Sequence, residues 1–305
     1  MAVVEGRVGL IVNPASRAGA RAEAPVLAVL AAAGIRPTVE HTRETGDGVR
    51  AARDLAPTHD CILVLGGDGT LMEAATGLAE LKADLPLGIL PGGTGNQIAR
   101  AISMPMSAVR AVRRLIADGE VRTIDCGVLN DRRRVGIGVG MGLDAAMIAG
   151  ARGRLKQVLG VGSYVVSALS HAWRPHRFPV RATVDGRVFE RDCSVVLAVN
   201  LGYMFRGLMQ AVPGSSLTDG RIDLAMLETR HLYDFVHWSI TRAMLRLSGD
   251  DPRWTYASGE HITIETPDPT VQAQVDGDLI TPTRFALQVL PRALRLIVPH
   301  GVSII

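Results

Sequence analysis

In the first 125 residues, short continuous apolar runs alternate with segments in which apolar residues recur at helical spacing. Short apolar runs predict buried strands at 7–12, 37–41, 61–65 and 87–90, and apolar residues at helical spacing lie between them. Helices are expected at 22–33, from about residue 48 to residue 55, at 71–81 and at 98–102. Because strand, loop and helix alternate, this pattern predicts an α/β domain, a parallel sheet with helices on both faces.

The pattern changes near residues 123–127. Strands of antiparallel style are predicted at 126–139 and 178–199, each broken by a turn sequence, Asn130-Asp131 and Asp185-Gly186 respectively. Further strands are expected at 261–265, 271–275, 285–290 and 294–298, and helices at 144–154, 164–172 and 231–247. The chain therefore holds a second, β-rich domain.

Composition narrows the classes of partner. The 305 residues carry a formal charge of +3, a mild basic excess that suits nucleotides or acidic lipid surfaces and is too small to indicate nucleic-acid binding. Cys61, Cys126 and Cys193 are far apart and no Cys/His cluster occurs, which argues against structural zinc and disulfides and favours a cytoplasmic protein. No signal peptide or spanning helix is recognisable, so we expect a protein that is soluble or attached to a membrane surface.

A glycine-rich loop, Gly66 to Thr70, joins an apolar run to a helix. Its glycines allow a ligand to approach the backbone, and the N-terminus of the following helix suits a phosphate. Asp68 is an anion and cannot attract phosphate, so it would hold a metal or water network or handle a proton. The alternative is an ordinary turn with Asp68 and Thr70 as helix caps.

Two more polar loops follow predicted strands, at 13–19 and 91–97. Ligands of parallel sheets bind at the carboxyl ends of the strands, so the three loops are expected to form one site that could hold a triphosphate. The G-x-x-x-x-G-K-[ST] sequence is absent, which excludes a P-loop NTPase. Asn13-Pro14 stands where a dinucleotide-binding Rossmann domain needs its first glycines, which argues against that class.

Five motifs together resemble the diacylglycerol kinase and sphingosine kinase family of lipid kinases, in the same order and over nearly the whole chain: Asn13-Pro14-Ala15-Ser16, Gly66-Gly67-Asp68-Gly69-Thr70, Pro91-Gly92-Gly93-Thr94-Gly95-Asn96, Asp219-Gly220-Arg221-Ile222-Asp223 and Asp276-Gly277-Asp278. The resemblance implies a nucleotide-binding α/β domain at 1–125 and a mainly antiparallel, β-sandwich-like lipid-acceptor domain at 126–290. It also implies that 291–305 returns to the first domain and that ATP and lipid meet in the cleft between the two.

The resemblance also implies roles for individual residues. The nucleotide would be bound by Asn13, Thr42, Gly66, Gly67, Asp68, Gly69, Thr70, Leu71, Met72, Gly93 and Thr94. A structural Mg²⁺ would be held by Asp219 with the main-chain carbonyls of Ser216 and Arg221, which are the hard oxygen ligands that this ion prefers. Asp276 would accept the proton of the lipid hydroxyl, Asp278 would orient Asp276, and Asp68 would reach the metal through water.

The sequence departs from the family pattern at three places. Most relatives carry Asn at the position of Met72 and Glu at that of Asp278, and bacterial members have several glycines where 203–209 stands. Apolar residues of 203–209 are candidates for the lipid-binding lining, and Trp173 to Phe178 mixes aromatic and basic residues as interfacial segments do. These departures leave the acceptor lipid open.

The expected activity is ATP- and Mg²⁺-dependent phosphorylation of diacylglycerol or a related lipid in phospholipid metabolism. Such an enzyme would work in the cytoplasm with transient contact to the inner membrane face, and the sequence leaves a homodimer open. The alternatives are a sphingoid-base or ceramide kinase, a kinase of a soluble acceptor similar to NAD kinases, and a non-catalytic lipid-binding regulator. The joint presence of Asp68, Asp219 and Asp276 argues against the regulator, because a protein that only binds lipid needs no base.

Overall fold

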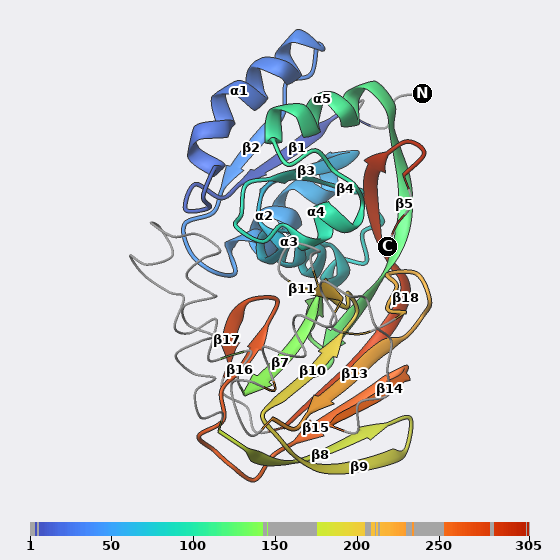
Figure 1. The fold of residues 1–305 in the computed structure, drawn as a ribbon. Helices are drawn as coiled ribbons and strands as arrows, with labels where there is room; N and C mark the ends of the chain where they lie inside the picture. The colour runs from blue at the N-terminus through green and yellow to red at the C-terminus, as the bar shows by residue number, and fades with distance from the viewer. Residues whose placement is uncertain are drawn as a thin grey trace. The chain divides into compact units, whose positions relative to one another are not determined.

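The computed structural model describes residues 4, 6–142, 145, 176–204, 209–210, 212, 214–229, 234, 253–280, 284–302 and 304 (Figure 1). Its contacts divide the chain into two compact units. Unit 1 comprises Met1–Cys126 and Pro291–Ile305, and unit 2 comprises Gly127–Leu290. The chain passes between them along two strands, β5 (Gly119–Leu129) and β18 (Arg284–Pro299).

Unit 1 contains a parallel sheet with strand order β2-β1-β3-β4-β18. Its elements are β1 (Val8–Val12), α1 (Gly19–Ala32), β2 (Thr38–His41), α2 (Asp47–Leu55), the 3₁₀ turn Ala56–Thr58, β3 (Cys61–Gly66), α3 (Asp68–Glu80), β4 (Leu87–Pro91), α4 (Gln97–Ala101) and α5 (Ala108–Asp118). Strands β1, β3 and β4 are buried at every position, as their continuous apolar runs predict for a sheet covered on both faces.

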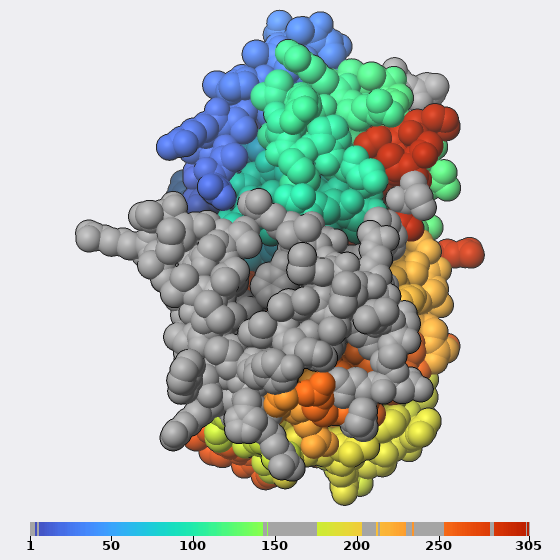
Figure 2. All heavy atoms as spheres, in the orientation of Figure 1, coloured from blue at the N-terminus to red at the C-terminus, as the bar shows by residue number. Residues whose placement is uncertain are grey.

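Four of the helices described in unit 1 pack in two pairs. α1 packs against α5, and α2 packs against α3; the blue atoms of α1 and the green atoms of α5 lie side by side in Figure 2. The chain moves in one direction along the sheet from β1 to β2 and in the other direction from β2 to β3 and β4. Right-handed crossovers therefore place α1 on one face and α2 and α3 on the other. The predicted α/β class is confirmed.

Several boundaries differ from those predicted. α3 begins at Asp68 and not at residue 71, because its first turn contains the polar end of the glycine loop, which carries no apolar signal. α5 and β14 (Trp254–Gly259) are additional elements. β18 is one strand where two were expected, since it continues through Pro291 and through Arg292, whose φ of 53° is left-handed.

Unit 2 consists of two layers of mainly antiparallel strands. One contains β6 (Arg133–Val135), β8 (Phe178–Val184), β9 (Arg187–Cys193) and β15 (His261–Glu265) with parts of β5 and β18. The other has the order β14-β13-β10-β7-β16-β17, where the strands not yet defined are β7 (Gly138–Gly142), β10 (Val195–Val199), β13 (Ile222–Leu227), β16 (Ala273–Val275) and β17 (Asp278–Ile280). A separate two-stranded antiparallel sheet pairs β11 (Tyr203–Met204) with β12 (Met209–Gln210).

One hydrophobic core joins the two layers of unit 2. Phe178, Phe285 and Leu287 from the first layer are buried together with Met141 and Leu224 from the second. Buried and exposed positions alternate along β8, as expected for a strand with one face on the core. The predicted β-sandwich-like architecture is confirmed.

Other predictions lie outside the described residues. These are the helices at 144–154, 164–172 and 231–247, apart from Ala145 and Asp234, and the side chains of the 203–209 segment. Of the aromatic and basic segment 173–178 only the last three residues are described, and Phe178 is buried in the core. Within the described parts of the chain, no helix has both the length and the apolar character needed to cross a membrane.

Candidate active site

The three polar loops of unit 1 are hydrogen-bonded to one another at the carboxyl end of the sheet. Asn13, after β1, donates its N–H to the carbonyl of Leu65 at 2.9 Å. Gly92, after β4, donates to the carbonyl of Gly66 at 2.7 Å, and its own carbonyl accepts from Ala18 at 2.9 Å. The predicted meeting of these loops is therefore present in the structure.

The two glycine loops touch backbone to backbone. A Cβ built on Gly93 would lie 2.7 Å from the Cα of Gly67, closer than side chains tolerate. Around Gly69, in contrast, a Cβ would meet nothing within 4 Å. Gly93 is thus required by the contact between the loops, whereas Gly69 borders open space beside the first turn of α3.

Asp68 links the start of α3 to the start of α4. Its Oδ2 accepts the N–H of Gln97 and its Oδ1 the N–H of Ile98, both at 2.9 Å. Burial raises the pKa of Asp68, while these two donors act in the opposite direction. The carboxylate therefore caps a second helix across the loops, and its predicted water-mediated link to Mg²⁺ stays a prediction.

Asn13 and Thr42 hold further loops in place. The side-chain amide of Asn13 donates to the Thr70 hydroxyl at 2.9 Å and its oxygen accepts the N–H of Ser16 at 3.1 Å. Thr42 follows β2, is buried, and donates its N–H to the carbonyl of Val12 at 2.9 Å. Both lie next to strand ends in unit 1, where the nucleotide was predicted to bind.

Three other residues that were predicted to bind the nucleotide differ in their solvent exposure. Leu71 and Met72 are 0% and 2% exposed with their backbone included, so both residues pack in the core. Their predicted contact with the nucleotide stays a prediction. The Asn-to-Met departure at Met72 therefore places an apolar side chain in an apolar environment. Thr94 is half-buried in the second glycine loop.

In unit 2, the carboxylate of Asp276 lies in a concave group of backbone donors. Gly136 donates to Oδ2 at 3.0 Å, and Ile137 and Gly138 donate to Oδ1 at 2.9 and 3.0 Å. The N–H of Asp276 donates to the carbonyl of Gly138 at 3.0 Å, and its φ of 50° is left-handed. Three consecutive N–H groups and a strained backbone fix this carboxylate in one orientation.

The environment of Asp276 changes its acidity. Burial raises its pKa to about 6, against the lowering effect of the three N–H groups and of the Arg133 guanidinium. A carboxyl group with this pKa is ionised for most of the time at neutral pH and still takes up a proton readily. These are the properties that a general base requires.

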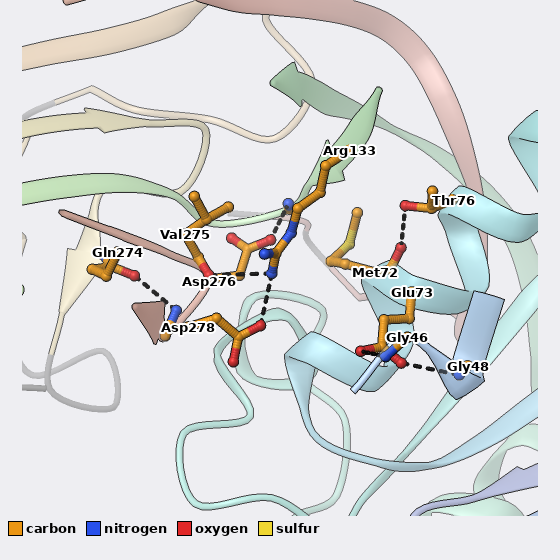
Figure 3. Close-up of polar contacts among 12 residues, drawn as sticks. Gly46, Gly48, Met72, Glu73, Thr76, Arg133, Gln274, Val275, Asp276 and Asp278 are labelled. Carbon is orange, nitrogen blue, oxygen red and sulfur yellow. Dashed lines mark hydrogen bonds and ion pairs between the residues drawn. The ribbon is translucent and has the colours of Figure 1, made fainter. Parts of the chain in front are cut away.

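Asp278 contacts Arg133, as Figure 3 shows. The Arg133 guanidinium donates to Asp278 Oδ2 at 2.8 Å and to the carbonyl of Val275 at 3.4 Å. Among the described residues Asp278 makes no hydrogen bond to Asp276. The backbone of residues 136–138 contacts Asp276 directly, and Asp278 pairs with Arg133 beside the β16–β17 turn. The predicted role of Asp278 in orienting Asp276 stays a prediction.

The predicted metal residues lie on an exposed turn before β13. Asp219 Oδ1 accepts the N–H of Arg221 at 3.0 Å, and the Ser216 hydroxyl accepts the N–H of Thr218 at 3.3 Å. The guanidinium of Arg221 donates to the hydroxyl of Ser258 in β14 at 2.9 Å. No group of three or more His, Cys, Asp or Glu side chains gathers for a metal in the described residues, so a site here would combine one carboxylate with main-chain carbonyls.

Three features of the site were not predicted. Glu73, on α3, accepts the N–H groups of Gly46 and Gly48 (Figure 3). The second feature is Arg133, and the third is the donor group 136–138. The sequence contains a signal for the donor group, since glycines at 136 and 138 allow close backbone approach, but Glu73 and Arg133 are ordinary surface-type residues without one.

The comparisons with known proteins agree with this architecture. Residues 7–129 match the diacylglycerol kinase catalytic domain, and residues 137–298 match the YegS C-terminal NAD kinase beta sandwich-like domain. The diacylglycerol kinase of Bacillus subtilis (strain 168) is 28% identical over 256 residues, which are 84% of this chain and 83% of that protein. That of Staphylococcus saprophyticus is 28% identical over 275 residues, 89% of this chain and 88% of that one.

A solved structure has the same fold over nearly the full length. It is described as a "putative diacylglycerol kinase" from Bacillus anthracis and matches with a TM-score of 0.80 at 26% identity, over 97% of this chain and 98% of its own. Domain composition, relatives and fold agree on one assignment. The chain belongs to the diacylglycerol kinase family of lipid kinases, with a catalytic domain followed by a NAD kinase-like β-sandwich domain.

Proposed function

We propose that this protein transfers the γ-phosphoryl group of ATP to the hydroxyl of diacylglycerol or a related lipid, with Mg²⁺ as the metal. The observation that carries the proposal is the carboxylate of Asp276, fixed by three backbone donors and given a pKa of about 6. A chain that only bound lipid would gain nothing from a base held in this way.

Unit 1 supplies the phosphate-binding surface of the proposed site. The first-turn N–H groups of α3, including those of Gly69 and Thr70, have no acceptor within their own helix, and the positive end of the helix dipole lies there. Open space beside Gly69 allows a phosphate to approach these donors. Backbone N–H groups therefore take the place that a lysine fills in P-loop proteins.

In the proposed reaction, Asp276 accepts the proton of the lipid hydroxyl as that oxygen bonds to the γ-phosphorus. The bond from phosphorus to the β,γ-bridging oxygen breaks, and ADP leaves with that electron pair. The protonated Asp276 then returns its proton to solvent. The donors at 136–138 hold the carboxylate throughout, so no reorganisation is needed during the transfer.

The residues predicted for Mg²⁺ suit a hard cation. Asp219 is exposed and its Oδ1 accepts the N–H of Arg221 at 3.0 Å, so the carboxylate lies on the turn whose main-chain oxygens at Ser216 and Arg221 would complete the site. When bound, Mg²⁺ would add positive charge that neutralises phosphate oxygens or stabilises the turn. The buried Ser215 next to it donates its hydroxyl to the carbonyl of Asn200 at 3.4 Å, and Asn200 donates its side-chain amide to the carbonyl of Gly136 at 3.3 Å. The turn and the Asp276 donors therefore belong to one hydrogen-bonded network.

A lipid acceptor implies work at a membrane surface. We propose a cytoplasmic enzyme that touches the inner membrane face transiently, without nucleic acid as a partner. A homodimer is compatible with this proposal, and sedimentation measurements would test it.

The test is a transfer assay with γ-labelled ATP and Mg²⁺ against diacylglycerol, a sphingoid base and ceramide in mixed micelles, with NAD as a soluble acceptor. We expect label in one of the lipids, diacylglycerol first. Label in NAD alone would replace the lipid acceptor by a soluble one, and label in no acceptor would overturn the proposal.

A further inference from the structure

α3 connects the loops around the candidate nucleotide site through three side chains, each directed to a different loop. Asp68 accepts two N–H groups from the start of α4, and Thr70 accepts the Asn13 amide from the loop after β1. The third is Glu73, whose Oε1 accepts the N–H of Gly46 at 2.8 Å and whose Oε2 accepts that of Gly48 at 3.0 Å. The loop after β2 is thereby tied to the same helix.

The glycines at positions 46 and 48 allow Glu73 to make these hydrogen bonds. A Cβ on Gly48 would lie 2.7 Å from Glu73 Oε2 and 2.8 Å from its Cβ, so only glycine leaves room for the carboxylate. Gly46 has a φ of 96°, a left-handed conformation that directs its N–H toward Glu73 at little cost for glycine. Two glycines and one glutamate, from segments 25 residues apart, therefore fit together.

We propose that Glu73 is a positioning residue of the nucleotide site, holding the Thr42–Gly48 loop against α3 at the carboxyl end of the sheet. Glu73 itself does not touch the nucleotide in this proposal. Because its carboxylate sits at the N-terminus of α2, it also occupies the dipole end that would otherwise attract a phosphate, and so leaves the end of α3 as the phosphate site. The inference rests on the proposed function, since it concerns the binding of ATP.

Two substitutions test the contact between Glu73 and the loop, one in each partner. Glu73→Gln replaces one acceptor oxygen with an amide donor that faces a backbone N–H, so it breaks one of the two hydrogen bonds. Gly48→Ala leaves Glu73 intact and displaces it sterically, although alanine favours the helical conformation of α2. A matched control is Glu80→Gln, because Glu80 is on the same helix and pairs with Arg53 of α2 at 3.5 Å, where both side chains are about half exposed.

The experiment measures ATP binding by calorimetry, the KM for ATP, the KM for lipid, kcat and the thermal midpoint of each variant. For Glu73→Gln and Gly48→Ala we expect the Kd and KM for ATP to rise about tenfold, the order expected for a lost hydrogen bond to a charged group, with kcat and the KM for lipid unchanged. The control should match the wild type in all of them. Unchanged ATP affinity in the two variants, or an equal loss in the control, would overturn the inference.

A second measurement covers the case in which neither variant folds. Hydrogen exchange of the wild-type segment 42–48 should slow when ATP is added, because the proposal places this loop at the nucleotide. Exchange that ATP does not change contradicts the inference. A wild-type protein that binds ATP and phosphorylates lipid but shows no such slowing leaves the proposed function intact, so the two failures are distinguishable.

Discussion

The pH dependence of the transfer rate follows from the environment of Asp276. Burial raises its pKa from 3.8 to about 6, so kcat/KM should fall as the pH falls through that value and the base becomes protonated. The ionised fraction is about nine-tenths at pH 7 and about one-tenth at pH 5, which predicts a loss of roughly tenfold between them. A carboxyl group with the ordinary pKa would stay more than about 90% ionised at pH 5 and give almost no loss.

The assay is the initial rate of phosphate transfer at subsaturating lipid, in buffers of constant ionic strength from pH 5 to 8. ATP also titrates in this range, so the acidic limb has to be assigned. Arg133→Gln serves this purpose, because the Arg133 guanidinium lowers the pKa of Asp276 and its loss should move the limb to higher pH. A limb caused by ATP would not move.

Two results would refute this reasoning. A profile that is flat down to pH 5 would show that no group with a raised pKa controls the rate. A limb near pH 6 that keeps its position in Arg133→Gln would assign the titration to the nucleotide and remove the evidence for Asp276 as the base.

Other predictions concern the glycine loops and stability. Gly93→Ala should lower both the thermal midpoint and the ATP affinity, because its Cβ would meet the backbone of Gly67. Gly69→Ala should keep the thermal midpoint and weaken only ATP binding, because its Cβ enters open space. Equal thermal midpoints for the two variants would contradict this. Asp68→Asn turns one acceptor into a donor facing an N–H group, so its free energy of unfolding should fall by about 1–3 kcal/mol in urea titrations. Asp276→Asn also places an amide donor opposite an N–H group, so it should be less stable than the wild type at pH 4. That deficit should shrink by on the order of 1–3 kcal/mol between pH 4 and pH 8. This pH trend follows because the raised pKa of Asp276 contributes stability to the wild type that is present below pH 3.8 and is lost as the pH rises through about 6. A stability difference between wild type and variant that stays constant across pH would contradict it.

The fold could be predicted because its signals are local. Apolar runs such as Cys61 to Leu65 identified the buried strands, and the glycines between strand and helix identified the loops. The start of α3 was predicted three residues late, since the turn at Asp68 is polar and carries no apolar signal. The contacts of Asp68 with Gln97 and Ile98 also gave no sequence signal. Those contacts join residues about 30 positions apart, which no local pattern reports.

The roles of individual acidic residues depended on the fold in the same way. Asp276 could be singled out from its motif, but its orientation comes from the backbone of 136–138, more than 100 residues away in the chain. Glu73 carries no unusual sequence signal, because its importance derives from the two glycines that it meets. Sequence thus indicated which loops matter, and the structure indicated which side chains hold them together.

The central claim is that Asp276 is the base of an ATP-dependent lipid kinase. The most direct measurement compares the wild type with Asp276→Asn for transfer of γ-labelled phosphate from ATP to diacylglycerol in mixed micelles, with ATP affinity measured in parallel. The account predicts labelled lipid with the wild type and a rate lower by about 10²–10⁴-fold in the variant, at unchanged ATP affinity. Label in no lipid, or an undiminished rate in the variant, would contradict it.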